Sequence, residues 1–523
     1  MKSIRRAKAV ELARLSEVIL LVIARLGLQA LLYHAGFQAF TADDFGRTVV
    51  AAIWAQKPFA QWCAVWLPFP MYMYGVALRF IWELVWVPRA IGIVFGIAAI
   101  LLMYQLSEAL FDEHRIGLVG AILLAINPVH IWLSSTPLTE TVHIALVLAF
   151  LLCLVLYSKS KNHVFLYLGA FSLAIANGFR FDAWIVSGLF SLYIVGEGTV
   201  RVLRQDRYTR QAPLLPVAAI IPWVFPIVWL TGCCIETGNP LFSPAWTLSY
   251  NKTWYGSARD FSAYLDTFLG IDPCLPILAP LSLVTCLIRY RSSRSVKWYV
   301  VMAVIPLAIF VCLMGGQIEP PANNTRYFAL YAFILYPSVA YLLSSAVGRI
   351  TRSQLVEIVL LTIVVLVIVV TQVHATFQFV NDPAADGLEV GKRIRALRAE
   401  HPELSQRPVL VELSYWQYLA VHVGANDISL LIYDRELDLE HRQTVSLFLS
   451  DLGAIRNCLA LYNVSYIAVK SPEIKEVIER ELGMLSSEEV NHFSFYRVPD
   501  MMRDDVGDGL CPLAMTPSLQ SGD

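Results

Sequence analysis

The sequence predicts an all-α polytopic membrane protein with about eleven transmembrane helices and a small C-terminal α/β extracytoplasmic domain. Of its 523 residues, 57% are hydrophobic and only 15% are charged, whereas soluble domains carry about 25% charged residues. Apolar runs of about 20 residues, long enough to cross the hydrocarbon layer, recur along the first 375 positions. Residues 1–380 carry a net charge of +9 and residues 381–523 a net charge of −10, which indicates a membrane body followed by a water-soluble domain.

The distribution of basic residues predicts the orientation of the spans. We place the spans near residues 15–35, 88–110, 116–134, 141–157, 163–180, 183–200, 212–231, 270–288, 298–316, 327–347 and 354–374. With a cytoplasmic N-terminus, 18 Lys and Arg residues fall inside and eight outside, as the positive-inside rule requires. This assignment lays the aromatic segment from Trp66 to Trp86 along the outer surface, within an outer loop 36–87. We therefore expect a multi-pass protein of a prokaryotic cytoplasmic membrane, with its C-terminal domain outside.

The remainder of the chain changes in pattern. Between residues 381 and 500, short β-rich runs alternate with helical stretches such as 388–400 and 441–460, which predicts a small soluble α/β domain. This domain contains no glycine-rich phosphate loop and no nucleophile elbow, so we expect it to have a supporting or recognition role rather than a catalytic one. Residues 501–523 have the composition of a disordered tail.

Two further features exclude some classes of protein. No basic run with interleaved aromatic residues stands outside the short polar loops, so a nucleic-acid partner is disfavoured. The nine cysteines show no CxxC or zinc-like spacing, and several lie in apolar stretches. We interpret them as small core residues, and they leave the redox compartment open.

Ionisable residues gather in the loops assigned to the outer face, where such a collection indicates function. Four separate loops contribute three carboxylate positions and two arginines, namely Asp43 with Asp44, Glu140, Arg180 with Asp182, and Arg326 followed by Tyr327. Carboxylates can deprotonate a hydroxyl or hold a divalent cation, and arginines can neutralise a phosphate with bidentate donors. The set suits nucleophilic displacement of a lipid phosphate.

Each of these residues also has a structural interpretation. The acidic pair in the first loop could be merely solvated. Glu140 could stand at the first turn of a helix because the helix dipole favours a carboxylate there, and Arg180 could simply pair with Asp182. Glu140 and His143 form one i,i+3 pair, which falls short of a metal site, so we interpret His143 and the nearby His130 as structural.

The order of these features resembles the GT-C polyprenyl-phosphate-dependent glycosyltransferases, the group that includes protein O-mannosyltransferases and aminoarabinose transferases. The resemblance runs through the acidic pair, Trp66-Leu67-Pro68, NPVHIWLS before Glu140, RFDAW, and the late Arg326-Tyr327 pair. It covers residues 10–375 in order and spacing, and extends to YNVSYIAV in the C-terminal domain.

The resemblance implies roles for particular residues. Asp43 would be the base or a metal-associated carboxylate with Asp44 beside it, and Glu140 would be the second acidic position. Arg326 and Tyr327 would lie near the lipid phosphate, and Arg180 and Asp182 match a further Arg-aromatic-acid segment. Lys57 is a substrate-binding candidate, because Lys57-Pro58 stands where some members have Lys-Pro-Pro, a segment this sequence lacks. The GT-C group contains metal-dependent and metal-independent members, so the requirement for a divalent cation stays open. The sequence indicates no other cofactor.

We therefore expect an inverting glycosyltransferase that moves a sugar from a polyprenyl-phosphate carrier to a glycan, lipid or protein acceptor on the outer face. A mannose-like hexose is the leading candidate for the sugar. Two alternatives stay open. A secondary transporter would use the intramembrane Arg25 and the histidines, although its substrate groups would lie near the bilayer midplane. A membrane assembly or structural protein of envelope glycan synthesis would leave the loop carboxylates dispensable.

Overall fold

The chain forms two compact units in the computed structural model. Residues 2–203, 214–255, 262–314, 321–350, 354–413, 416–435, 446–499 and 511 are described. The first unit contains Met1–Phe37, Ala60–Pro70 and Ala90–Phe379, and the second contains Gln38–Phe59, Met71–Arg89 and Val380–Asp523. Parts of the expected outer loop 36–87 thus cluster with the C-terminal residues. The prediction of a disordered tail at 501–523 lies outside the described residues, except for Cys511.

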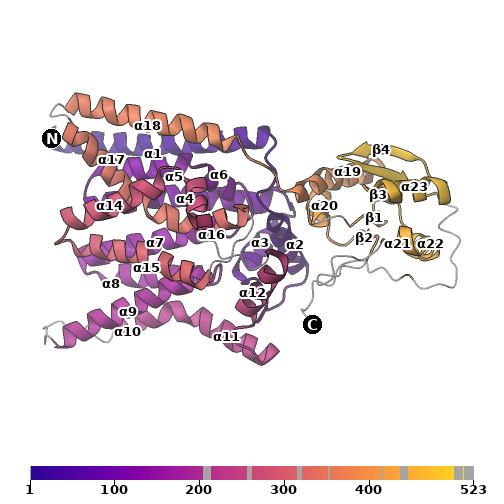
Figure 1. Ribbon diagram of the computed structural model, residues 1–523, viewed down its shortest axis with the longest axis horizontal. Coiled ribbons are helices and arrows are strands. Elements are labelled where there is room, and N and C mark those ends of the chain that lie inside the picture. Colours follow the sequence, from indigo (N-terminus) through magenta and orange to yellow (C-terminus); the bar gives the residue numbers. More distant parts are fainter. Residues whose placement is uncertain are drawn as a thin grey trace. The chain divides into compact units, whose positions relative to one another are not determined.

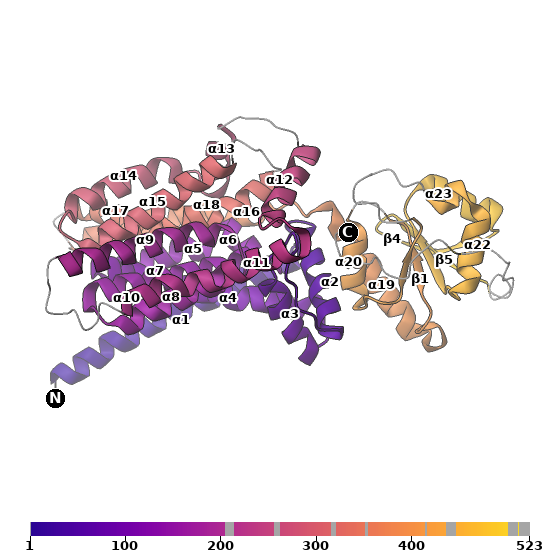
Figure 2. The ribbon, with the colours of Figure 1, turned by 90° about the horizontal axis from the view of Figure 1, so that it is seen from below.

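The first unit is a bundle of helices that run alongside one another (Figure 1; Figure 2). α7 packs against α6, α8, α15 and α16 at its centre. The helices that lie in this unit, wholly or in larger part, are α1 (Lys2–His34), α4 (Trp86–Phe111), α5 (His114–Ile126), α6 (Pro128–Ser134), α7 (Glu140–Ser160), α8 (His163–Ala176), α9 (Asp182–Leu203), α10 (Leu214–Ile220), η2 (Ile221–Trp223), α11 (Val224–Thr237), α12 (Phe242–Tyr255), α13 (Ser262–Ile271), α14 (Leu275–Arg289), α15 (Arg294–Met314), α16 (Pro321–Ile334), α17 (Tyr336–Ile350) and α18 (Gln354–Thr376).

Several of these helices can cross a membrane. Within the described residues, six helices are long and apolar enough to span it, and the number rises to nine if each of three bent pairs is one span. The expected count of eleven is therefore not confirmed. The aromatic segment 66–86 contains only the 12-residue helix α3 (Phe69–Phe80), which is not among the candidate spans.

Small residues allow α4 to lie close to α6. A Cβ atom at Gly92 would stand 2.8 Å from the carbonyl oxygen of Thr136, and one at Gly96 would stand 2.6 Å from the Cβ of Ser134. Close approach of this kind is the usual basis of helix association in lipid.

Arg25 supports the break between α5 and α6, which meet at an angle of 65° at Asn127. It is buried and donates hydrogen bonds to the carbonyl oxygens of Ala125 (2.8 Å) and His130 (3.1 Å), and to the hydroxyl of Ser134. A broken helix in lipid leaves carbonyl groups without intrahelical partners, and they must be satisfied from nearby side chains. Arg25 thus has a structural role, which removes one reason to expect a translocation path.

All three bent helix pairs meet at one group of polar residues. The amide nitrogen of Asn127 donates to the carbonyl oxygen of Ile271 (2.8 Å) at the end of α13 and to the hydroxyl of Tyr336 (3.0 Å) at the start of α17. The Tyr336 hydroxyl donates in turn to Asp272 (3.2 Å), between α13 and α14. The breaks at α5–α6, α13–α14 and α16–α17 therefore share one hydrogen-bonded network.

The second unit contains the expected α/β domain. Its five-stranded sheet has the order β2-β1-β3-β5-β4, in which β1 pairs in parallel with β2 and β3, and β5 pairs antiparallel with β3 and β4. Residues of β1, β2, β3 and β5 that face one side pack with the helices α21 to α23. The elements are η3 (Pro383–Ala385), α19 (Asp386–Glu400), η4 (Pro402–Leu404), β1 (Val409–Val411), α20 (Gln417–Ala425), β2 (Leu431–Tyr433), α21 (Leu447–Ser450), α22 (Leu452–Leu461), β3 (Tyr466–Val469), α23 (Pro472–Glu481), β4 (Ser486–Val490) and β5 (Phe493–Arg497).

Two segments from the first loop complete the second unit. The helix α2 (Asp43–Gln56) packs against α20. Asn426, in the left-handed conformation that ends α20, accepts a hydrogen bond from the backbone N–H of Leu84 (2.9 Å), and its carbonyl accepts one from the indole of Trp82 (3.0 Å). Asn381 accepts another from the backbone N–H of Gln38 (2.7 Å).

Four of the nine cysteines form disulfides, which corrects the interpretation of all of them as core residues. Cys63 pairs with Cys233 in the first unit, and Cys458 pairs with Cys511 in the second, with Cα–Cα distances of 4.7 and 4.9 Å. The partners are 170 and 53 residues apart in sequence, so spacing gave no sign of the pairing.

We expect the stability of the second unit to depend on pH through His422. Its Nδ1 atom donates to the carbonyl oxygen of Asp427 (3.0 Å), and its Nε2 atom accepts from the hydroxyl of Tyr433, so both nitrogens are satisfied in the neutral ring. Burial lowers the pKa of His422 to about 4. Because only the unfolded chain binds this proton between pH 6.5 and 4, we expect the free energy of unfolding to fall across this window, by about 3 kcal/mol in total.

Hydrogen exchange of the α20 amides in the full-length protein, corrected for the intrinsic effect of pH, measures this loss. His422→Gln should remove most of the pH dependence. His401→Gln is the control, because His401 is partly exposed and its ion pair within the described residues is with the exposed Glu403. Protection that stays constant from pH 6.5 to pH 4 would contradict the prediction.

Candidate functional site

Two carboxylates of the first unit lie at the N-termini of membrane helices. Glu140 is the first residue of α7, and Asp182 is the first residue of α9. Both side chains are buried, with 2% and 4% of each residue exposed. The positive end of the helix dipole favours a carboxylate at this position, so the local structure stabilises both negative charges at one end of two neighbouring helices.

The turn between α8 and α9 places Arg180 between these carboxylates. Asn177 ends α8, and its amide nitrogen donates to the carbonyl oxygen of Pro222 (2.6 Å) and the hydroxyl of Ser187 (3.0 Å). The next residue, Gly178, leaves no room for a Cβ atom, because the ring of Phe69 occupies that space. The indole of Trp184 donates to the Asn177 carbonyl (3.0 Å) and so holds the turn from its other side.

Arg180 forms ion pairs with both acids. Its Nη1 atom lies 2.6 Å from Oε1 of Glu140, and its Nε atom lies 3.0 Å from Oδ1 of Asp182. Burial works against the charge of the guanidinium, but the carboxylates of Asp182 and Glu140 outweigh burial and raise the pKa of Arg180 above its ordinary value. Arg180 therefore stays charged.

α16 adds the second arginine. Nε of Arg326 lies 3.9 Å from the same Oε1 atom of Glu140, and its Nη2 atom donates to the hydroxyl of Tyr327 (3.0 Å). The Tyr327 ring lies 5.1 Å from the guanidinium of Arg180 and 4.9 Å from that of Arg326, within cation–π range of both. The structure thus brings together five predicted site residues, Glu140, Arg180, Asp182, Arg326 and Tyr327, which we call the charge cluster.

Two residues beside the charge cluster were not predicted to take part. Nε2 of His143, one turn into α7, lies 3.6 Å from Oδ1 of Asp182, and the histidine is 1% exposed. Tyr331, one turn beyond Tyr327 in α16, is buried and lies near enough to Asp182 and Arg180 to interact electrostatically. The i,i+3 and i,i+4 spacings to Glu140 and Tyr327 were the available signals.

The remaining predicted residues lie in the second unit. Asp43 is the first residue of α2 and is partly exposed. Asp44 is buried, and its Oδ2 atom accepts hydrogen bonds from the backbone N–H groups of Phe40 (2.6 Å) and Thr41 (3.2 Å). Lys57 is exposed just after the other end of α2, about 20 Å from Asp43 by the rise of a helix. The structure does not bring Lys57 near Asp43.

The charge cluster does not fit a divalent cation. Glu140 and Asp182 are each paired with an arginine, and a second cation between them would meet that positive charge. Among the described residues, no group of three His, Cys, Asp or Glu side chains has the geometry of a metal site.

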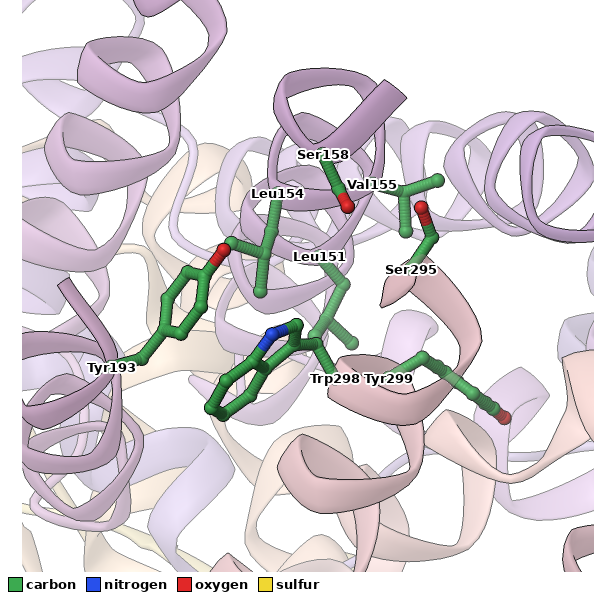
Figure 3. Close-up of a pocket in the computed structure, with 8 residues that line it drawn as sticks. All are labelled: Leu151, Leu154, Val155, Ser158, Tyr193, Ser295, Trp298 and Tyr299. Atoms are coloured by element: carbon green, nitrogen blue, oxygen red, sulfur yellow. The ribbon is translucent and has the colours of Figure 1, made fainter. Parts of the chain in front are cut away.

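A small cavity lies elsewhere in the first unit. It is lined by side chains of α7, α9 and α15, among them Leu151, Leu154, Tyr193 and Trp298 (Figure 3). The rings of Tyr193 and Trp298 are 4.0 Å apart. No charged side chain is among the residues that line this cavity, and none of the residues of the charge cluster lines it.

The architecture matches solved membrane proteins. ArnT from Cupriavidus metallidurans in the apo state superposes with a TM-score of 0.59 at 12% identity, over 94% of this chain and 99% of that chain. The apo oligosaccharyltransferase of Archaeoglobus fulgidus superposes with a TM-score of 0.53 at 13% identity, over 87% of this chain and 69% of that chain. Both neighbours are GT-C proteins. The chain has the GT-C fold.

The GT-C fold confirms the predicted class, a helical multi-pass membrane body with a small α/β domain. No protein-family model and no curated protein matches the sequence. At this level of identity the likeness is one of fold, and the chemistry must be argued from the side chains.

Proposed function

We propose that this chain, which has the GT-C fold, is an inverting glycosyltransferase that transfers a sugar from a polyprenyl-phosphate carrier to a glycan, lipid or protein acceptor on the outer face of the membrane. A mannose-like hexose is the leading candidate for the sugar. Two neighbours support the choice of carrier. One structure shows AglB from Archaeoglobus fulgidus in complex with an inhibitory peptide and a dolichol-phosphate. Another shows ArnT from Cupriavidus metallidurans bound to undecaprenyl phosphate.

The charge cluster is the observation that carries this proposal. Arg180 and Arg326 converge on one oxygen of Glu140, and paired guanidinium groups are the preferred ligands of phosphate. In the proposed reaction the arginines hold the carrier phosphate and stabilise its charge as the bond to the sugar breaks. Asp43 is the proposed base for the acceptor hydroxyl, by its resemblance to the loop carboxylate of the family.

The disulfides support the proposed orientation. Disulfides persist in oxidising compartments outside the cytoplasm. Cys63 belongs to the loop that we assign to the outer face, and Cys458–Cys511 belongs to the C-terminal domain. Both bonds favour a non-cytoplasmic location for these regions. This agrees with the proposed orientation in a prokaryotic cytoplasmic membrane, with a cytoplasmic N-terminus.

Sugar transfer from synthetic polyprenyl-phosphate hexoses to candidate acceptors by the purified protein tests the proposal. We expect Arg326→Ala to lower kcat/KM by about 100-fold or more, because truncating one partner of a buried charge pair costs at least about 2–3 kcal/mol. Asp43→Asn should lower the rate by about 100-fold or more if it removes a general base. Arg14→Ala is the control, since the ion pair of Arg14 within the described residues is a solvent-accessible one with Glu108. Transfer by Asp43→Asn and Arg326→Ala at the wild-type rate would overturn the site.

One observation favours a secondary transporter instead. Three bent helix pairs meet at Asn127, and broken helices line the substrate path of many transporters. Uptake of candidate solutes into proteoliposomes that is abolished by Asn127→Ala, together with no transfer from any polyprenyl-phosphate donor, would select this alternative.

A further inference from the structure

We propose that binding of the carrier phosphate draws a proton onto His143, so that donor binding and proton uptake are coupled. This inference rests on the proposed function, since it takes the charge cluster as the phosphate site. Nothing in the sequence assigned His143 more than a structural role.

The first step is the balance of charge. Arg180 and Arg326 carry two positive charges, and Glu140 and Asp182 carry two negative ones, so the charge cluster is neutral before an anion binds. All four side chains are buried or largely buried. A bound phosphodiester adds one negative charge, and an uncompensated charge is costly in a buried site. A proton taken up by the cluster restores neutrality.

The second step is the state of His143. Neither of its ring nitrogens has a hydrogen-bond partner among the described residues, and Oδ2 of Asp182 has none either. Two acceptors nevertheless stand beside the ring, the carboxylate of Asp182 at 3.6 Å and the backbone carbonyl of Ala176. An imidazolium has two N–H donors, whereas a neutral ring has only one.

The third step concerns the other groups around the ring. His143 lies beside Asp182 of the charge cluster, and histidine is the side chain whose charge changes near neutral pH. When a phosphate draws Arg180 towards itself, Asp182 loses part of its ion pair and gains from a new one with His143. The charged groups that act on the ring are Asp182 at the start of α9, Arg180 before it, and Glu140 on α7. The elements that pack against α7 also carry titratable or charged groups, namely Arg326, Tyr327 and Tyr331 on α16, His163 and Tyr167 on α8, His130 on α6, and Arg294, Lys297, Tyr299 and Cys312 on α15.

Calorimetric titration of the full-length protein in nanodiscs tests the coupling. The probe is a polyprenyl methyl phosphodiester, whose single charge does not titrate near neutral pH, used in buffers of different ionisation enthalpy. We expect uptake of up to about one proton per bound anion, and binding that tightens by as much as about tenfold for each unit that the pH falls. His143→Asn should bind with no uptake and a flat pH profile. His130→Asn, a buried histidine against Phe333, should behave as wild type.

The possible results separate the two proposals. Anion binding by the wild type without proton uptake overturns the role of His143 and leaves the proposed function intact. Uptake that persists in His143→Asn assigns the proton to another group and also overturns the role of His143. Absence of any anion binding refutes the proposed function itself. If His143→Asn does not fold, ¹⁵N chemical shifts assigned to individual histidine rings of the wild type decide, because the ring of His143 itself must become doubly protonated when the anion binds.

Discussion

Arg180→Ala is expected to reduce sugar transfer by about 1000-fold or more and to lower the stability of the first unit. The substitution leaves Glu140 and Asp182 buried beside a single arginine, and removal of one partner from a buried ion pair typically costs about 3–5 kcal/mol. In the proposed reaction the substitution also removes one of the two guanidinium groups that hold the phosphate. The transfer rate therefore falls in addition to, and separately from, the loss of stability. Thermal unfolding in detergent and the transfer assay measure the two effects separately.

Companion variants distinguish charge from geometry. Arg180→Lys keeps the positive charge, but a single ammonium cannot reproduce the planar donors that reach both acids, so we expect only partial recovery. Arg180→Met combined with Glu140→Gln restores a neutral cluster and should recover stability but not transfer. Recovery of transfer in this double variant would contradict the role of Arg180 in phosphate binding, and wild-type stability in Arg180→Ala would contradict its role in the stability of the first unit.

Loss of the Cys63–Cys233 disulfide is expected to give the second large effect. The bond closes 170 residues of chain, and a cross-link of this span stabilises a protein by about 2–5 kcal/mol, mostly by restricting the unfolded state. It also fixes the segment of Cys63 against α11, where Leu67 and Trp229 form a buried apolar cluster with Cys233. We expect the double variant Cys63→Ser with Cys233→Ser to unfold at a clearly lower temperature than the wild type.

The second disulfide supplies the matched control. Cys458–Cys511 closes only 53 residues, so its removal should cost about 1 kcal/mol less by loop length alone, and the effect should appear in the second unit. Hydrogen exchange of α11 and of α22 in the full-length protein distinguishes the two. Equal protection of α11 with and without the Cys63–Cys233 bond would contradict the prediction, and mass mapping of unreduced peptides verifies that each bond forms.

The charge cluster could be predicted because its members share one side of the membrane. Hydropathy placed Glu140 at the start of a span, Arg180 and Asp182 between two spans, and Arg326 at the start of another, and alternation of spans brought these positions to one end of the bundle. Pairing within that set was beyond the sequence, since a spacing along the chain does not say which arginine reaches Glu140. The two residues added by the structure, His143 and Tyr331, lie one helical turn from predicted members.

Features that depend on contacts between distant segments could not be predicted. Arg25 reads as an isolated charge in a span, and its partners are carbonyl groups about 100 residues away that become available only because α5 breaks at Asn127. The inclusion of residues 38–59 and 71–89 in the second unit depends on side chains such as Asn426, which give no periodic signal. The same holds for both disulfides, because connectivity between cysteines is not encoded in their spacing.

The polar network at Asn127 couples the bends of three spans mechanically. The side-chain amide of Asn127 is hydrogen-bonded to the end of α13 and to Tyr336 at the start of α17, and the Tyr336 hydroxyl is hydrogen-bonded to Asp272. A change of angle at one of these joints would therefore strain or break the hydrogen bonds that hold the other two. The segments beyond the joints are α6, α13 and α16, and α16 carries Arg326 of the charge cluster.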